Sequence, residues 1–261
     1  MEPSSVLTLL DRADREASLP RLGGMARADG VVIVSERFWA FAGVDGSVRE
    51  GQMPCPPRVL RHVPLVRGLV RLGSSLAPLF RGAGVARLRE RWFLAAAIVA
   101  PLTLVWAPHW LGLAAGFVTT GALMAWLLRG RTLFLHGAEH RAIAAVEERR
   151  LRSTWNGEAR PSRFSLRCGT NFAALLLPVA ILGQRVWPLP TAAFTPLVVT
   201  VLSLAVTMEL WQLVQASSRR VARVLLVPGL LLQRLTTREP QLVETRVALR
   251  AVASVLHREL D

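Results

Sequence analysis

Two histidines and a glutamate within five consecutive residues form the pattern best suited to chemistry in this sequence. They are His136, Glu139 and His140. Residues three and four apart in a helix lie on one face, so both imidazoles and the carboxylate would project together. His-x-x-Glu-His is also the inverted zinc-protease order, in which the histidines bind metal and the glutamate activates water. The spacing predicts a divalent transition metal, zinc being one that fits, with Glu139 as the catalytic base.

The composition around this motif is apolar and strongly basic. Apolar residues make up 52% of the 261-residue chain, the formal net charge is +14, and every basic side chain is arginine. Such a chain is either a membrane protein with positive cytoplasmic segments or a nucleic-acid binder. The arginines flank apolar regions, and aromatic residues do not interleave with them as they do in nucleic-acid binders. We therefore expect contact with anionic lipids and no nucleic-acid partner.

Two long apolar regions predict about four transmembrane helices. Residues 92–128 contain no charged side chain. Because one span needs about 20 residues, this region predicts two helices that meet at a turn near 107–110. The second region, residues 168–208, predicts spans near 169–184 and 192–213, separated by a Pro-rich turn.

The distribution of arginine predicts how these spans are oriented. The segments 81–91, 129–167 and 219–223 are rich in arginine, whereas the two turns between paired spans contain almost none. Positive segments stay in the cytoplasm. Both termini and the His136 motif should therefore face the cytoplasm in a multi-pass protein of the cytoplasmic membrane.

The expected fold is mainly α, a multi-pass membrane protein with a small N-terminal β element and cytoplasmic amphipathic helices. Residues 1–22 are polar and predict a mobile tail. Residues 23–91 predict the β element followed by an amphipathic helix, which either lies on the membrane surface or packs on the β element. Residues 92–261 predict the four-span domain, including the His-x-x-Glu-His helix and a C-terminal helix.

Two further residues are expected to join the histidines as metal ligands. Cys168 and Glu209 both fall at predicted cytoplasmic ends of spans, at the same depth as His136. Thiolate and imidazole are ligands that zinc accepts, and an acid near a span requires a partner. The predicted metal ligands are thus His136, His140, Cys168 and Glu209.

Several stretches together resemble the uncharacterised, YqhQ-like integral membrane family DUF1385. The matching segments cover most of residues 23–256: Gly23-Gly24, Arg67-Gly68, His136 to His140, Glu147, Arg167 to Thr170, Glu209, and Pro228 to Pro240. The resemblance implies a metal-dependent enzyme without a known substrate. In relatives a histidine occupies the position of Ser165, so this chain is a divergent member whose ligand set is smaller.

Two functions from different classes follow from these residues. The first is a membrane-bound, metal-dependent hydrolase whose site lies at the cytoplasmic interface. The second is a non-enzymatic scaffold or assembly module, in which arginines neutralise Glu139 and Glu209 and the motif forms a buried polar network. Either function allows a homo-oligomer or a membrane-protein partner.

Overall fold

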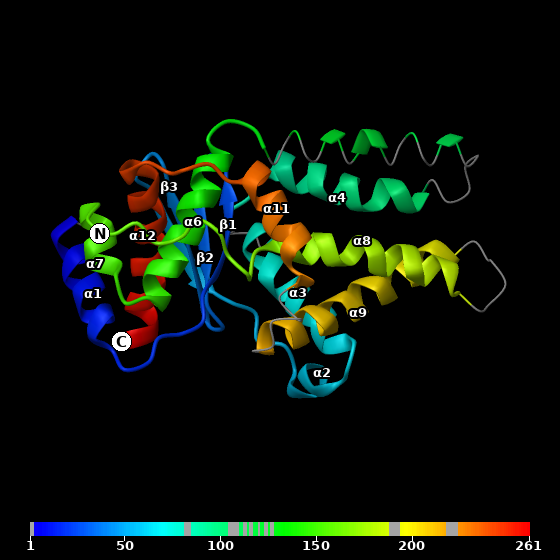
Figure 1. Ribbon diagram of the computed structural model, residues 1–261, viewed down its shortest axis with the longest axis horizontal. Coiled ribbons are helices and arrows are strands. Elements are labelled where there is room, and N and C mark those ends of the chain that lie inside the picture. The colour runs from blue at the N-terminus through cyan, green and yellow to red at the C-terminus, as the bar shows by residue number, and fades with distance from the viewer. Residues whose placement is uncertain are drawn as a thin grey trace. The chain divides into compact units, whose positions relative to one another are not determined.

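The computed structural model divides the chain into two compact units, and each unit combines stretches that are distant in sequence (Figure 1). This division differs from the consecutive domains expected from the sequence, because the β element, the His136 segment and the C-terminal helix pack together. Unit 1 comprises Met1–Cys55, Leu127–Cys168 and Leu230–Asp261, and unit 2 comprises Pro56–Trp126 and Gly169–Gly229. The structure describes residues 3–80, 85–103, 128–187, 194–217 and 224–261, together with 110–111, 114, 117–119, 121–122 and 125.

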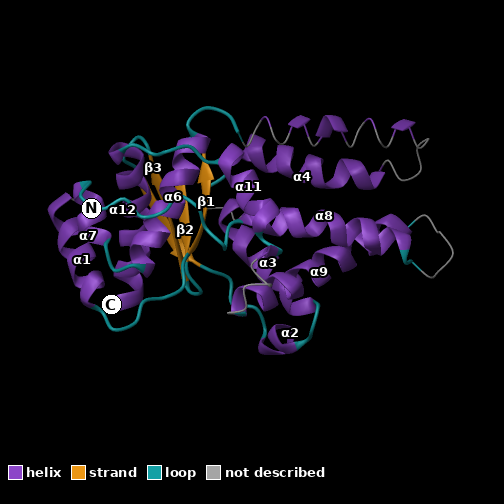
Figure 2. Cartoon of the chain, viewed as in Figure 1, coloured by secondary structure: helices purple, strands orange, loops and turns teal. Residues whose placement is uncertain are grey.

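Unit 1 contains a four-stranded antiparallel sheet in the order β1-β2-β3-β4 (Figure 2). Alternate side chains of the central strands point to one face, since Val31 pairs with Ala42 and Ile33 with Ala40. Gly46 adopts a positive φ of 86° in the turn before the last strand. The predicted β element is confirmed, with one additional strand. The strands are β1 (Gly23–Arg27), β2 (Gly30–Val34), β3 (Phe38–Gly43) and β4 (Val48–Gln52).

Two long helices cover one face of this sheet. Helix α6 (Thr132–Glu147) packs on β1 and β2, and α12 (Leu242–Leu260) packs on β2, β3 and α6. Their small residues, such as Ala138 and Ala248, are completely buried in the shared core. This close packing holds α6 rigidly, which is what a site on its surface requires.

The N-terminal segment forms helix α1 (Pro3–Arg15), which corrects the prediction of a mobile tail. Val6, Leu10 and Ala13 of this helix are buried in the core of unit 1. The acidic residue Asp14 accepts hydrogen bonds from the backbone N–H groups of Leu151 and Arg152 at 2.9 and 3.0 Å. It thereby supports the start of α7 (Leu151–Asn156), beside which α1 lies (Figure 1).

Unit 2 is helical in its described part. Helix α9 is paired along its length with α8, and the amphipathic helix α3 also packs on α9. At this contact a Cβ added to Gly68 would lie 2.6 Å from the Cβ of Met208, so only glycine allows the approach. The helices are α2 (Arg58–His62), α3 (Val66–Phe80), α4 (Leu88–Thr103), α8 (Gly169–Arg185) and α9 (Thr195–Ala216); α11 (Val227–Thr236) then leads back into unit 1.

One helix among the described residues, α9, is long and apolar enough to cross a membrane by length and composition. It corresponds to the fourth predicted span, and several of its large apolar side chains, including Leu202 and Val206, are exposed. Helix α8 matches the third prediction in position. Much of the first two predicted spans, including residues 107–109 of the predicted turn, lies outside the described residues. An arrangement of four spans is therefore a proposal.

Candidate metal centre

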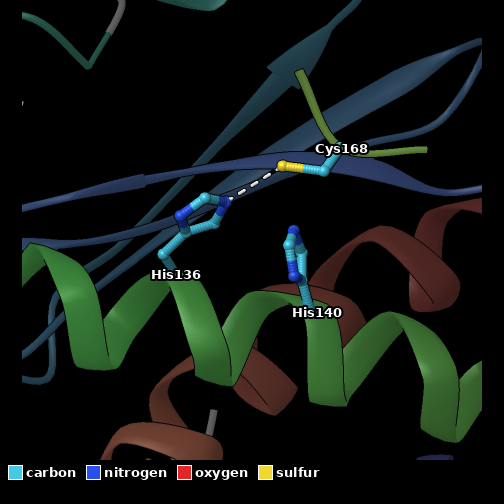
Figure 3. Close-up of side chains that lie close together, drawn as sticks. All are labelled: His136, His140 and Cys168. Atoms are coloured by element: carbon cyan, nitrogen blue, oxygen red, sulfur yellow. Dashed lines mark hydrogen bonds between the residues drawn. The ribbon is translucent and has the colours of Figure 1, made fainter. Parts of the chain in front are cut away.

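Three predicted metal ligands meet within unit 1. The side chains of His136 and His140 project from one face of α6 towards Cys168 (Figure 3). One potential ligand atom from each residue lies within 4.8 Å of the others, and His136 Nε2 is 3.2 Å from Cys168 Sγ. Tetrahedral zinc with ordinary Zn–N and Zn–S bonds holds such atoms about 3.3–3.8 Å apart. Small side-chain rotations would therefore bring the three atoms into coordination distance.

Backbone carbonyls orient both imidazole rings. His136 Nδ1 lies 2.9 Å from the carbonyl oxygen of Thr236, and His140 Nδ1 lies 2.7 Å from that of Arg163. A carbonyl oxygen only accepts, so each Nδ1 carries the proton and each neutral ring keeps its lone pair on Nε2. Carbonyl groups fix the tautomer and the ring orientation of metal-binding histidines in the same way.

Burial keeps both rings neutral. Burial lowers the pKa of His136, although its bond to Thr236 partly opposes this. Burial and the neighbouring His136 lower the pKa of His140 to about 3. His140 is 2% exposed, and its Nε2 has no hydrogen-bond partner among the described residues. An unsatisfied buried nitrogen costs free energy, and a metal ion beside Cys168 would remove that cost.

Glu139 is buried on the same helix, next to the sheet. Its side chain is packed against β1, where a Cβ on Gly24 would lie 2.9 Å from Glu139 Oε1. The residue is 5% exposed, and burial raises its pKa to about 8. The carboxyl group is therefore protonated at neutral pH in the metal-free protein, and glycine at position 24 provides the space that it fills.

Glu209, the fourth predicted ligand, belongs to unit 2 and is the one member of the set that the structure does not place in this cluster. Both of its carboxylate oxygens accept hydrogen bonds from Arg67, and Oε1 also accepts one from the backbone N–H of Leu65 at 3.1 Å. The carboxylate thus has a charged partner inside its own unit.

The groups that hold the site together were not predicted from the sequence. Thr236 and Arg163 contribute backbone carbonyls, which leave no side-chain signal. Gly137 allows the segment after α11 to approach, since a Cβ there would lie 2.2 Å from the carbonyl oxygen of Arg238. The glycines in Gly23-Gly24 and His136-Gly137 were the sequence signal for these close contacts, because glycine recurs where backbones approach closely.

The family to which the chain belongs follows from a comparison with known protein families. The family model described as "Protein of unknown function (DUF1385)" matches residues 117–258, more than half of the chain. The chain belongs to the DUF1385 family. The match contains all four predicted ligands of this DUF1385 protein, whereas the β-sheet lies before it. No curated protein and no solved structure matches the chain.

The buried acid of this DUF1385 protein should make its metal-free form less stable at alkaline pH. Unfolded Glu139 loses its proton near pH 4.5, whereas folded Glu139 keeps it to about pH 8. The unfolded state then binds fewer protons, so stability falls with rising pH by about 1.4 kcal/mol per unit. His140 acts in the opposite direction only below pH 6.5, where the unfolded ring gains a proton.

Between pH 6.5 and 8, Glu139→Gln should therefore flatten the pH dependence, removing a loss of about 2 kcal/mol. The free energy of unfolding, measured at several pH values with a chelator present, checks this result. Parallel curves for wild type and Glu139→Gln would show that Glu139 is ionised in the folded protein.

Proposed function

We propose that this DUF1385 protein is a membrane-bound, metal-dependent hydrolase with its site at the cytoplasmic interface. The observation that carries the proposal is the pair of Nδ1–carbonyl bonds, which turns two neutral Nε2 lone pairs towards Cys168. Histidine and cysteine together suit zinc, and three protein ligands leave a fourth position for water or substrate. Zinc bound there would supply Lewis acidity and lower the pKa of water towards neutrality.

Glu139 supplies the proton chemistry in this proposal. It lies between the two histidine positions on α6 and is shielded from solvent by β1. A nearby cation favours the carboxylate form and lowers the pKa of the acid. Glu139 would then accept a proton from the attacking water and return it to the leaving group.

Substrate turnover tests the hydrolase proposal. Wild type loaded with zinc should hydrolyse at least one chromogenic substrate among carboxylic esters, phosphate esters and peptides. Glu139→Gln should retain zinc and lose about a hundredfold or more in rate, the size expected for a general base. Equal rates in wild type and Glu139→Gln would remove Glu139 from the mechanism.

The sequence also predicts Glu209 as a fourth ligand, and Glu209→Gln tests that prediction separately. Loss of bound zinc would assign Glu209 to the site. Retained zinc with a lower unfolding temperature would assign it to the ion pair with Arg67. We expect the second result, because Glu209 already has a guanidinium and a backbone N–H as partners. Metal analysis and thermal unfolding of the same sample separate the two outcomes.

The membrane arrangement proposed is four spans with both termini in the cytoplasm, where arginine-rich segments contact anionic lipids. Helix α9 and the arginine distribution support it. Cys55 is exposed and Cys168 is buried, so Cys55 is a natural probe. A membrane-impermeant maleimide should label Cys55 in inverted vesicles and not in intact cells, and Cys55→Ser should abolish the labelling. Labelling of Cys55 in intact cells would show that Cys55 lies outside the cytoplasm, which is the opposite of the proposed orientation.

A non-enzymatic scaffold is favoured by one specific observation, the well-satisfied polar network behind the histidines. Gln233 is fully buried and exchanges hydrogen bonds with the backbone N–H and carbonyl of Ser165 at 2.9 and 2.7 Å. Such contacts specify a shape without any catalysis. This function, acting as a homo-oligomer or with a membrane partner, predicts that His136→Ala lowers stability equally with and without zinc.

A further inference from the structure

A pocket in unit 1 is distinct from the metal cluster. It has a volume of about 400 Å³ and lies where the end of α7, the segment before α12 and the start of α12 meet. This volume is within the range of small-molecule sites. The residues that matter for its chemistry are Arg141, Thr154, Arg160, Glu239 and Leu242.

Arg141 provides a buried cation with donors to spare. The residue is 6% exposed, and its guanidinium donates to the carbonyl oxygens of Pro161 and Pro240, at 3.1 and 3.2 Å, and to Glu239. A guanidinium has five N–H donors, so these three bonds leave part of its capacity unused. Arg160 also lines the pocket, is exposed, and has no ion-pair partner among the described residues.

Neutral donors accompany the two guanidinium groups. Thr154 is 1% exposed, and its Oγ1 has no hydrogen-bond partner in the part of the chain that the structure describes. At the start of α12, Gln241 caps the N–H of Glu244, which leaves Leu242 N–H without an intrahelical acceptor. The carbonyl of Thr154 at the end of α7 is already bonded to Gly157 N–H at 3.1 Å. The pocket is therefore lined by two guanidinium groups and a buried hydroxyl group that can all donate hydrogen bonds.

We propose that this pocket binds the phosphate group of a small molecule or lipid headgroup. A phosphate monoester offers three strongly accepting oxygens and two negative charges, which match guanidinium, hydroxyl and helix N-terminal donors. A carboxylate, with two oxygens, would leave more of these donors unmatched. The site is independent of the metal centre, so it stands or falls separately from the proposed hydrolase activity.

In the ligand-free protein, the carboxylate of Glu239 occupies the position beside Arg141 that we propose for the phosphate. It is the acid that lines the pocket; its carboxylate bonds to Arg141, and its other oxygen lies 3.7 Å from Arg163 Nε. The Glu239 side chain is 61% exposed, so it can turn into solvent at little cost when a phosphate arrives. Removing its charge should therefore strengthen phosphate binding, the opposite of what loss of a structural ion pair would do.

Calorimetric titration of the purified full-length chain with inorganic phosphate tests the proposal. Thr154→Val, which preserves shape, should weaken binding about fivefold, and Arg160→Gln about tenfold. Glu239→Gln should tighten binding several-fold. Arg150→Gln changes an exposed arginine outside the pocket and should bind as wild type does. Titration of the wild type in the presence of a chelator should give the same phosphate affinity, which excludes capture by metal.

Two further titrations identify the source of the phosphate. If glycerol 3-phosphate binds as tightly as short-chain phosphatidic acid, the ligand is a soluble phosphate ester. If phosphatidic acid binds at least about tenfold tighter, the ligand is a lipid headgroup. The proposal is overturned if none of the three probes gives saturable binding, or if Thr154→Val, Arg160→Gln and Glu239→Gln all bind as wild type does.

Discussion

Replacing His140 with alanine is expected to lower the affinity for zinc by at least about a hundredfold, or on the order of 3 kcal/mol. The substitution removes an imidazole whose Nε2 has no hydrogen-bond partner within the described ranges and whose Nδ1 is fixed by the carbonyl of Arg163. His136 on α6 and Cys168 in the segment before α8 are already in contact with each other. Neither side chain can therefore take the place of the lost imidazole. Competition with a chromophoric chelator measures the affinity.

His257→Ala is the matched control for this measurement. His257 is also helical and belongs to unit 1, but its ring is exposed and its partner is Asp261. Zinc affinity should be unchanged in this variant. Wild-type affinity in His140→Ala, with the fold verified by circular dichroism, would show that the three side chains are not a metal site.

Gly137→Ala is expected to destabilise unit 1 by about 3 kcal/mol or more. The new methyl group would lie 2.2 Å from the carbonyl oxygen of Arg238 and 3.2 Å from Cδ of Pro240. The first contact is with backbone, which cannot rotate away as a side chain can. The same segment donates a backbone hydrogen bond from Arg238 to Leu133 at 2.9 Å. Moving it would therefore also disturb Thr236, so zinc affinity should fall.

Denaturant unfolding of wild type and variant checks this effect, with Gly73→Ala as the control. Gly73 is in α3, and an added Cβ there would meet nothing within 4 Å. Alanine should be neutral or stabilise that helix by up to about 1 kcal/mol. If Gly137→Ala were as stable as wild type, α6 and the segment before α12 could not be in such close contact.

The sequence was sufficient to place the two histidines together because their positions depend on local geometry. Cys168 was grouped with them by predicted depth, and the structure brings it to the histidines. The i, i+4 spacing of His136 and His140 is a property of any helix, and it needed only the prediction that this segment is helical. The β-branched run Val31 to Val34 also has the composition of a strand by itself. By contrast, β1 contains glycine, methionine and alanine, and it becomes a strand only by pairing with β2.

Other features depend on partners that are far away in the chain. Helix α1 has few apolar residues, and it is stable because Val6 and Leu10 enter a core supplied largely by α12 and α7. The neutral state of Glu139 depends on Gly24, which is more than a hundred residues away in sequence. Glu209 was grouped with the histidines by predicted depth alone, and depth does not reveal a partner such as Arg67.

Substitution of cobalt(II) into the purified, metal-depleted chain tests the metal centre most directly. Cobalt occupies zinc sites and reports its ligands by absorption. We predict binding of one equivalent, a thiolate-to-cobalt charge-transfer band in the near ultraviolet, and loss of that band in Cys168→Ser and not in Cys55→Ser. A chain that binds no cobalt, or that binds it without the thiolate band, would contradict a site built from His136, His140 and Cys168.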